Sequence, residues 1–506
     1  MLARSLHPAP KSPRFSIPGR LGLTAWLACA LPCGSFAQEA TRPEARNAIF
    51  FVGDGMGIST VTAARVFSVG VDGQLALDTM PFHALSRTAS SDSITADSAA
   101  TMSAMITGVS TNNGVISMGA ESEPADFNMD GDGPPATTLF ELAKAAGKRI
   151  GVVTTTRVTH ATPAACYAHG NHRDAENDFA LQALPTDASY NPALLGGLDL
   201  LAGGGRRQFL DASMTDEEGE AGRRSDGRDL RAEFQAANYE YVWNAEQWSA
   251  LGVEQLPVLA LFNSSHMEYE HDRALDLGGE PSLVELTLKA VELLEASADD
   301  NGWLLLVEAG RIDHAHHGGN AFRALRETEQ LDRAVEAASA AVNLEETLVL
   351  VTADHSHGFV LAGYPLRPLE ELPYKPRDWD EGFATGSARD RLLDVAYHLN
   401  ARTGEVRAAR DANGVPYTAL LYASGPGSRT AARVDPREDK ANGWFGAEPT
   451  GPRDPNYRQE AHVPLSSETH GGEDVSLYGV GAGSHRVRGT LSNTEIFQVM
   501  RRALGL

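Results

Sequence analysis

The sequence predicts an α/β fold: a three-layer sandwich with a large, mostly parallel central sheet flanked by helices, plus a small insertion subdomain. Two observations support this. Short runs of apolar, often β-branched residues recur along the chain, and stretches with helical periodicity separate them. Such alternation is typical of parallel sheets, whose strands are buried on both faces and are joined by helices. The sequence shows no internal repeat.

Five segments have the composition of buried parallel strands. They are NAIFFV (47–52), RIGVVTT (149–155), LDLLAG (198–203), WLLLV (303–307) and LVLVTA (348–353). Two of the intervening segments, 138–147 and 282–297, are predicted to be helices. In the second of them, the apolar residues recur close to the 3.6-residue period of a helix.

The first 37 residues have the features of a secretory signal peptide. Residues 1–20 contain four basic residues and no acidic one, and the short apolar run 21–34 follows. Ser35-Phe36-Ala37 then places small residues where a signal peptidase reads, so we expect cleavage before Gln38 and an exported, periplasmic or secreted protein. A membrane anchor is the alternative, but about 14 apolar residues are short for a bilayer. Lipid modification of Cys29 or Cys33 is a third hypothesis.

The remaining chain, 38–506, is expected to form the main domain. Residues 364–461 are rich in Pro, Arg and Asp and interrupt the strand–helix alternation. We therefore predict an elaborated insertion, or small subdomain, in this region. Insertions of this kind often cover a functional site.

Composition excludes several classes of partner. The formal net charge of -24 argues against binding to nucleic acid or to an anionic membrane. The C-terminal sequence VMRRALGL has no apolar tail, so no stable membrane anchor is expected there. Cys29 and Cys33 fall within the predicted signal peptide, which leaves Cys166 alone. Any metal must then be held by nitrogen and oxygen ligands.

Acidic and imidazole residues follow the predicted strands. Strand 47–52 leads into Asp54, strand 303–307 into Glu308 and the segment RIDHAHHGGN, and strand 348–353 into Asp354 and His355. Strand 149–155 leads to His160 and Thr162, and a late motif, SETH, adds His470. Each of these residues alone has an ordinary explanation as a turn, cap or loop residue. Because ligands bind beyond the carboxyl ends of strands in open α/β sheets, the whole set predicts one convergent site.

The ligand types favour metal ions. Asp313 and His317 are spaced i and i+4, so on a helical turn they share one face and can hold the same ion. Nitrogen and carboxylate ligands without thiolates suit catalytic zinc. A third set that is richer in oxygen, with Glu308, Thr162 and a shared Asp54, suits magnesium better. His314 and His316 point elsewhere on such a turn and need other roles.

Ser98 is the candidate nucleophile. It follows Asp97 and begins a run of small, helix-forming residues in SDSITADSAATMSAMITG (91–108). A serine at a helix N-terminus faces backbone amides and the positive end of the helix dipole, which favour an anion. The alternative is that Asp97 or Ser98 is only an N-cap. No G-x-S-x-G elbow accompanies it, so activation would have to come from a metal rather than from histidine.

Six ordered motifs carry a resemblance to the alkaline phosphatases. They are FFVGDGMG, ADSAAT, VTTTRVTHATPA, VEAGRIDHAHHGGN, VTADHSHG and SSETHGGEDV. The resemblance runs from about residue 46 to the C-terminus, except for the irregular region 364–461. It is closest to the vertebrate-like branch, which has histidines at the positions of His160 and His314. In that family the insertion would be crown-like, and the enzyme is usually a homodimer.

The resemblance implies a role for each matched residue. Ser98 would be phosphorylated, Arg173 would clamp two phosphate oxygens, and His314 would lie near the phosphate without binding metal. One Zn²⁺ would be held by Asp313, His317 and His470. The other Zn²⁺ would be held by Asp54, Asp354 and His355. A Mg²⁺ would be held by Asp54, His160, Thr162 and Glu308.

A calcium site is left open. The vertebrate pattern has a glutamate directly after a Leu-Phe pair, where this chain has Asn263. Glu217 and Asp272 are near other expected ligands.

The sequence is thus interpreted as an exported, metal-dependent phosphomonoesterase that acts on small phosphate monoesters through a phosphoserine intermediate. An alkaline optimum is implied by the family. The alternatives are a phosphodiesterase or sulfatase of the same superfamily, which typically use a threonine or a modified cysteine as nucleophile, and a non-catalytic phosphate- or metal-binding protein.

Overall fold

A computed structural model describes residues 45–124, 132–428 and 433–506. The predicted signal peptide, 1–37, lies outside these residues. In the described part of the chain, one ten-stranded sheet has the order β18-β2-β17-β8-β1-β7-β3-β4-β6-β5. Its strands are, in that order, Gly489–Ser492, Phe82–Arg87, Val475–Gly481, Thr347–Ala353, Asn47–Gly53, Trp303–Ala309, Arg149–Arg157, Leu200–Gly204, Val258–Leu261 and Glu240–Val242. The five predicted strands are confirmed, at positions β1, β3, β4, β7 and β8.

The sheet is mostly parallel. Strands β8, β1, β7, β3, β4, β6 and β5 pair in parallel along the sheet. Strand β17 runs antiparallel to both of its neighbours, β8 and β2. Every residue of β1, β7 and β8 is buried, as expected for strands covered on both faces.

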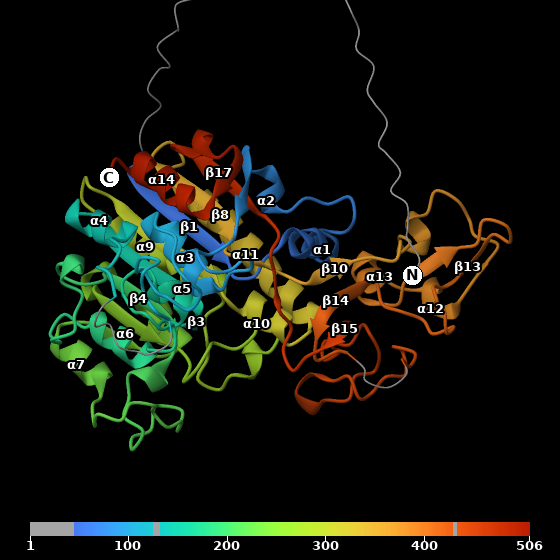
Figure 1. Ribbon diagram of the computed structural model, residues 1–506, viewed down its shortest axis with the longest axis horizontal. Coiled ribbons are helices and arrows are strands. Elements are labelled where there is room, and N and C mark those ends of the chain that lie inside the picture. Colours follow the sequence, from blue (N-terminus) through green and yellow to red (C-terminus); the bar gives the residue numbers. More distant parts are fainter. Residues whose placement is uncertain (1–44, 125–131, 429–432) are drawn as a thin grey trace, which may run out of the picture. The chain divides into compact units, whose positions relative to one another are not determined.

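Helices cover both faces of the sheet (Figure 1). On one face, Ile49 and Phe51 of β1 belong to a core that includes residues of α1 (Ile58–Val69), α9 (Leu283–Ser297) and α11 (Ala321–Ala341). On the other face, Phe50 and Val52 belong to a core with residues of α3 (Ser98–Thr107), α4 (Leu139–Ala145) and α14 (Asn493–Leu504). Successive side chains of β1 thus point alternately into the two cores and connect the three predicted layers. Full burial of each large apolar side chain contributes about 1.5–3 kcal/mol to stability.

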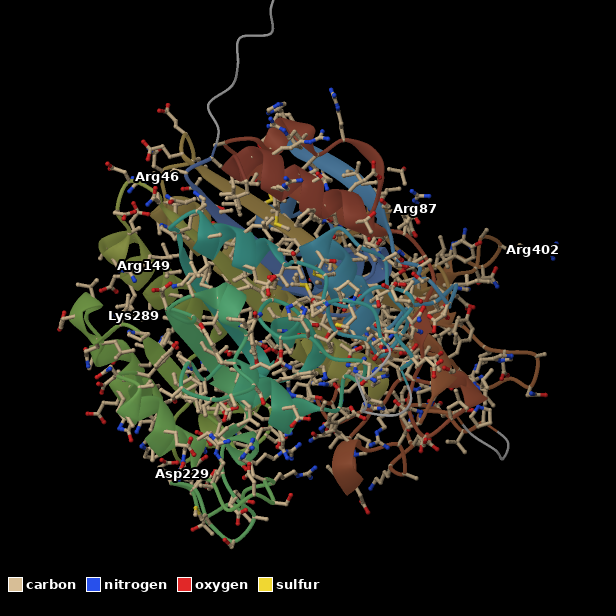
Figure 2. The ribbon with its side chains drawn as sticks, turned by 60° about the vertical axis from the view of Figure 1, so that its left-hand side comes forward. Arg46, Arg87, Arg149, Asp229, Lys289 and Arg402 are labelled. Carbon is tan, nitrogen blue, oxygen red and sulfur yellow. The ribbon has the colours of Figure 1, made fainter. Side chains whose placement is uncertain are left out.

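The other helices are short. They are α2 (Ala76–Thr79), α5 (Ala161–Ala164), α6 (Glu176–Gln182), α7 (Leu230–Ala236), α8 (Ala245–Ala250), α10 (Arg311–His317), α12 (Glu381–Ala384) and α13 (Ala388–Leu393). No helix within the described ranges is both long and apolar enough to cross a membrane. Charged side chains such as Arg87 and Arg402 extend from the surface (Figure 2).

Small sheets accompany the main one. Strands β10 (Phe359–Leu361), β14 (Leu420–Gly425) and β15 (Ala461–Pro464) form one, and β11 (Asp378–Trp379), β13 (Glu405–Ala408) and β12 (Tyr397–Leu399) form another. Most of these strands fall in the predicted insertion, 364–461. The two-residue strands β9 (Ser356–His357) and β16 (His470–Gly471) pair with each other and place His470 opposite His357.

Candidate active site

The carboxyl ends of the central strands meet at one edge of the sheet. Gly53, the last residue of β1, lies opposite Ala309 of β7 and Ala353 of β8. The residues that follow, Asp54 and Asp354, therefore leave the sheet at the same level. This register explains why a set of strand-end residues distant in sequence converges on one site.

Helix α3 carries the candidate nucleophile into this site. The Asp97 side chain accepts a hydrogen bond from the backbone N–H of Ala100 at 3.0 Å, so Asp97 is the N-cap. Ser98 is then the first helical residue, and its side chain is free to face the strand ends. All ten residues of α3 are buried, which requires the small residues of its sequence where the helix passes close to the sheet.

Ser98 contacts two of the predicted metal ligands. Its Oγ lies 3.2 Å from Asp54 Oδ1 and 3.1 Å from His355 Nε2. His355 Nε2 in turn lies 3.3 Å from Asp54 Oδ1 and 3.5 Å from Asp354 Oδ2. Asp54, Asp354 and His355 therefore form a buried group that could hold one cation directly beside the serine hydroxyl.

A second group surrounds Asp313 on α10. The predicted helical turn exists, and Asp313 Oδ1 lies 3.2 Å from His317 Nε2. His470 Nε2 lies 3.1 Å from His317 Nε2 and 3.5 Å from Asp313 Oδ1. These three side chains could hold one ion with two nitrogens and one oxygen, a donor set that suits zinc.

The third group contains Asp54, His160 and Glu308, whose donor atoms lie within 4.8 Å of one another. Thr162 is fully buried beside them at the start of α5. One oxygen of Glu308 accepts a hydrogen bond from Thr156 Oγ1 at 3.0 Å, but its Oε1 has no hydrogen-bond partner among the described residues. Asp54 Oδ2 and Asp354 Oδ2 are also buried without such a partner. Orphaned carboxylate oxygens of this kind fit divalent cations.

The electrostatics of the site agree with this fit. Burial raises the pKa of Asp54 well above its usual range, and the neighbouring carboxyl groups of Asp354, Asp313 and Glu308 raise it further. Burial also raises the pKa of Glu308 to about 7. Crowded, buried carboxylates repel one another, so positive charge placed between them would be strongly favoured.

Arg173 lies beside the N-terminus of α3, next to the cap residue Asp97. Its Nη1 donates to Asp97 Oδ2 at 2.8 Å, and its Nη2 lies 3.4 Å from His160 Nε2. Burial alone would lower the pKa of Arg173, but the adjacent Asp97 raises it, so the guanidinium stays charged. The Asp97 carboxylate thus connects the cap of α3 to an arginine close to the candidate nucleophile.

His314 is packed in a cluster of imidazole rings. Arg311 Nη1 donates to His314 Nδ1 at 3.1 Å. The His314 ring centroid lies 5.6 Å from that of His160 and 4.2 Å from that of His266. Burial lowers the pKa of all three histidines well below the usual range, so they are neutral. Sequence analysis did not identify His266, which is in a loop after β6 with no motif around it.

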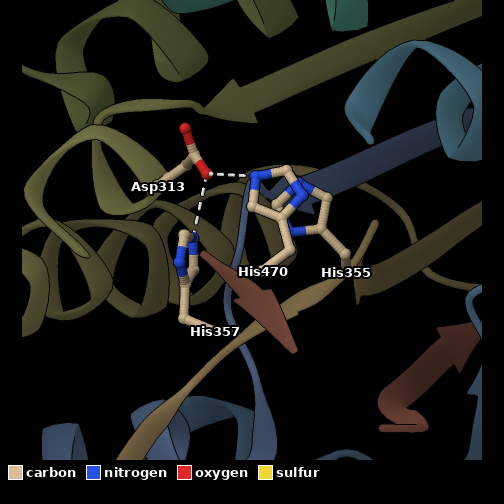
Figure 3. A group of neighbouring side chains, drawn as sticks. All are labelled: Asp313, His355, His357 and His470. Atoms are coloured by element: carbon tan, nitrogen blue, oxygen red, sulfur yellow. Dashed lines mark hydrogen bonds and ion pairs between the residues drawn. The ribbon is translucent and has the colours of Figure 1, made fainter. Parts of the chain in front are cut away.

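His357 was also not assigned a role from the sequence. Its Nε2 lies 2.9 Å from Asp313 Oδ1 (Figure 3), and its Nδ1 is hydrogen-bonded to Glu468 Oε2. Burial alone would lower its pKa, but these hydrogen bonds raise the pKa to about 9. Both ring nitrogens of His357 are thus engaged by carboxylates, although His357 also belongs to two groups of side chains that could hold a metal ion. Its contact with Asp313 Oδ1 is suited to orienting that carboxylate.

The remaining histidine of the RIDHAHH segment, His316, packs between α1 and β14. It is fully buried, with Nε2 3.0 Å from Thr60 Oγ1 and Nδ1 2.8 Å from the Tyr422 hydroxyl. The segment thus contains two candidate ligands, Asp313 and His317, and two histidines with other contacts, His314 and His316.

Comparisons with known proteins agree with this geometry. The alkaline phosphatase family profile matches residues 45–506. The chain is 34% identical over 500 residues to the alkaline phosphatase of Gadus morhua, covering 94% of this chain and 95% of that one. It is also 34% identical over 489 residues to the tissue-nonspecific isozyme of Homo sapiens, covering 92% of this chain and 85% of that one.

A solved structure extends the comparison to the fold. The crystal structure of the alkaline phosphatase of Thermus thermophilus superposes with a TM-score of 0.62 at 28% identity, covering 94% of this chain and 96% of that one. Sequence and structure therefore agree over almost the whole chain beyond the N-terminal segment. The protein belongs to the alkaline phosphatase family and is a phosphomonoester hydrolase.

Proposed function

We propose that this hydrolase works through a phosphoserine at Ser98, in a site that holds two Zn²⁺ and one Mg²⁺. The observation that carries the proposal is the position of Ser98 Oγ, 3.2 Å from Asp54 Oδ1 and 3.1 Å from His355 Nε2. A hydroxyl in direct contact with two candidate ligands can be activated without a histidine–aspartate relay.

The three groups of side chains suit different ions. Asp313, His317 and His470 would hold one zinc, and Asp54, Asp354 and His355 the other. Asp54, His160, Thr162 and Glu308 would hold magnesium. When bound, the cations supply positive charge that stabilises the attacking and leaving oxygens of a phosphoryl transfer.

The chain's own residues carry out the displacement. Ser98 Oγ forms a bond to phosphorus as the bond to the ester oxygen breaks, and the alcohol leaves with a proton. A water oxygen then bonds to phosphorus, the bond to Ser98 Oγ breaks, and inorganic phosphate is released as the serine regains its proton. Arg173 presents a planar fork that matches two phosphate oxygens, and Asp97 restricts its movement. His314, held neutral by burial, would contact the phosphate through water.

We leave calcium out of the proposed metal set. Glu217 Oε2 accepts a hydrogen bond from Arg231 at 2.9 Å, and Asp272 Oδ2 accepts one from Arg323 at 2.7 Å. Asn263 donates to Glu280 Oε1 at 2.8 Å. These oxygens are therefore engaged with cationic or amide donors.

The proposal extends to export, to small phosphate monoesters as substrates and to a homodimer. The basic segment 1–20 followed by the apolar run 21–34 supports export. The side chains of the site grip a phosphate group and contribute nothing specific to the alcohol, which supports broad tolerance of the leaving group. The acidic surface supports small molecules rather than nucleic acid as partners.

The test is turnover of p-nitrophenyl phosphate by the purified protein between pH 7 and pH 10. We expect activity to rise toward alkaline pH, to be lost on chelation, and to return only when zinc and magnesium are both added back. Bis-p-nitrophenyl phosphate serves as the parallel substrate, and a preference for the diester would contradict a monoesterase.

Ser98→Ala separates catalysis from binding. We expect this variant to lose turnover while it still binds inorganic phosphate, and rapid quenching of the unmodified enzyme should trap phosphate on Ser98. Turnover by the variant at the unmodified rate would rule out the phosphoserine mechanism.

A further inference from the structure

The position of the proton on His314 is set by its neighbour Arg311. Arg311 Nη1 lies 3.1 Å from His314 Nδ1. A guanidinium stays charged and has donors only, so Arg311 must donate in this pair and Nδ1 must accept. Burial, and next Arg311, lower the pKa of His314 well below its usual range, so the ring is neutral. Its single proton is therefore on Nε2.

The Nε2 atom of His314 is available to a ligand. It has no hydrogen-bond partner in the described part of the chain, and it keeps some accessible surface. The ring lies 5.6 Å from that of His160, whose Nε2 is 3.4 Å from Arg173 Nη2. His314 is thus a near neighbour of the arginine proposed to clamp phosphate, where an N–H can donate to a phosphate oxygen or to a water bound to one.

Packing holds the His314 ring in the orientation that this hydrogen bond requires. Its centroid lies 4.2 Å from that of His266. His266 is held in turn by Arg157, whose backbone N–H donates to His266 Nδ1 at 3.3 Å. A reversed His314 ring would place a carbon atom against Arg311 Nη1 and leave that donor without its acceptor. The contacts therefore select one orientation as well as one tautomer.

Arg311 itself is placed by an aromatic ring. Its guanidinium carbon lies 3.7 Å from the centroid of the Tyr269 ring. Among the residues that the structure describes, no carboxylate lies within ion-pair distance of Arg311, and its Nε is buried without a partner. A guanidinium on a ring face is held by cation–π attraction, which leaves the N–H groups at its edge free to donate.

The predicted insertion supports Tyr269. Trp444, from this insertion, has its ring centroid 5.6 Å from that of Tyr269. Both rings belong to a small core with Ala315 and Ala324. The insertion therefore contributes to the site indirectly, through the ring on which Arg311 lies.

A cation at this position has an electrostatic cost. Arg311 is the first residue of α10, where the positive end of the helix dipole disfavours a cation. An apolar side chain of similar length could pack on Tyr269 without that cost. What the guanidinium adds is the donor to His314.

We propose that Arg311 is a positioning residue for phosphate binding, which donates to His314 Nδ1 and so keeps the His314 proton on Nε2, facing the bound phosphate. The opposite tautomer would present a lone pair to the phosphate oxygens, and two acceptors repel each other. The proposal rests on the phosphate site proposed for Ser98 and Arg173. It does not require a phosphoserine, because the tautomer and phosphate binding are both measured without turnover.

The tautomer is tested by the ¹⁵N chemical shifts of the histidines in the metal-loaded, phosphate-free enzyme. A protonated ring nitrogen and one with a free lone pair have well separated shifts, and His314→Phe identifies the His314 signals. We expect a proton on Nε2 in the unmodified protein. Arg311→Met, whose side chain has no donor, should give a mixture of tautomers. A proton on Nδ1 in the unmodified protein would overturn the proposal, whether or not any variant folds.

Equilibrium dialysis with inorganic phosphate measures the consequence for binding. We expect Arg311→Met to weaken phosphate binding by roughly tenfold, equivalent to about 1.4 kcal/mol, and Arg311→Lys, which keeps a donor, to weaken it less. Arg389→Met is the matched control, because the Arg389 guanidinium also lies on an aromatic ring, 4.0 Å from the Phe67 centroid, but within the insertion. This control should bind phosphate as the unmodified protein does.

Combining Arg311→Met with His314→Phe separates positioning from a general effect on the fold. His314→Phe should weaken phosphate binding about as much as Arg311→Met does. If Arg311 acts through His314, the double variant should bind no more weakly than His314→Phe alone. A further tenfold loss would show that Arg311 acts by another route and would overturn the proposal, as would unchanged binding by Arg311→Met. A lack of phosphate trapped on Ser98 would count against the proposed mechanism but would not alter these measurements.

Discussion

At the scale of single residues, His357 illustrates how a neighbouring side chain can set the properties of a candidate metal ligand. It is held between the carboxylates of Asp313 and Glu468, and its hydrogen bonds to them raise its pKa to about 9. Its contact with Asp313 favours the ionised carboxylate and holds that carboxylate in one orientation. Burial alone would raise the pKa of Asp313, but His317 and His357 bring it well below its usual range.

We expect His357→Gln to weaken zinc binding by roughly 10–100-fold, the usual effect of losing a group that orients a ligand. Competition with a chromogenic chelator measures the affinity directly, without relying on turnover. His462→Gln, at an exposed histidine, is the control. An unchanged competition curve for His357→Gln would show that Asp313 does not depend on it.

The residues predicted from the sequence are those within short motifs at strand ends. Their partners were harder to find because the contacts span long stretches of chain. Glu468 is 111 positions after His357, and only the pairing of β16 with β9 brings them together. His266 has neither a motif nor a strand end beside it, and only its packing on His314 identifies it. A single sequence contains no signal for such contacts.

At the scale of elements, the Asp97 carboxylate at the N-terminus of α3 has two roles. Asp97 Oδ1 caps the helix through Ala100 N, and Asp97 Oδ2 accepts from both Gly114 N and Arg173 Nη1. The same side chain therefore holds both the helix of the proposed nucleophile and the arginine proposed to clamp phosphate.

Asp97→Asn should separate these tasks. The amide oxygen can still cap the helix, but the amide nitrogen cannot accept from Gly114 N, so the melting temperature should fall only by the few degrees that one lost hydrogen bond costs. The amide nitrogen cannot accept from Arg173, and holding a mobile guanidinium costs about 0.5–1.5 kcal/mol on binding. We expect KM for p-nitrophenyl phosphate and the inhibition constant for phosphate to rise roughly 3- to 10-fold, with kcat little changed. An equal loss in kcat and kcat/KM would instead indicate that Ser98 itself had moved.

Also at the scale of elements, the burial of a strand determines whether the sequence predicts it. The central strands are buried on both faces and read as continuous apolar runs. Strand β2, FHALSR, is buried at Ala84 and Ser86 only, and β17 includes the small residues of VSLYGVG. These strands lie toward one side of the sheet, where burial is partial and pairing turns antiparallel, so composition alone does not distinguish them from loops.

At the scale of the whole molecule, buried acids limit stability at high pH. Glu327 on α11 is 3% exposed, and burial raises its pKa to about 7. Between the pKa of the unfolded chain and about 7, the folded state holds a proton that the unfolded state has released. Stability therefore falls as pH rises through this window, and the loss is complete above it.

We expect Glu327→Gln to stabilise the protein at pH 8 relative to pH 5, by on the order of 2–3 kcal/mol, since each pKa unit is worth about 1.4 kcal/mol. The glutamine oxygen can still accept from Glu270 N, which lies 2.6 Å from Glu327 Oε1. The free energy of unfolding at both pH values measures the effect, and Glu336→Gln at an exposed position of α11 is the control. The same free-energy difference at both pH values would show that Glu327 is ionised in the folded protein.

The pairing of β16 with β9, and the place of β17 between β8 and β2, have a consequence for truncated forms of the protein. His470 and the strand that joins β2 to the rest of the sheet both come late in the sequence of the domain. A product that stops before His470 would lack one candidate ligand and would leave β2 and β18 without their link to β8. We therefore expect such a truncated product to be inactive.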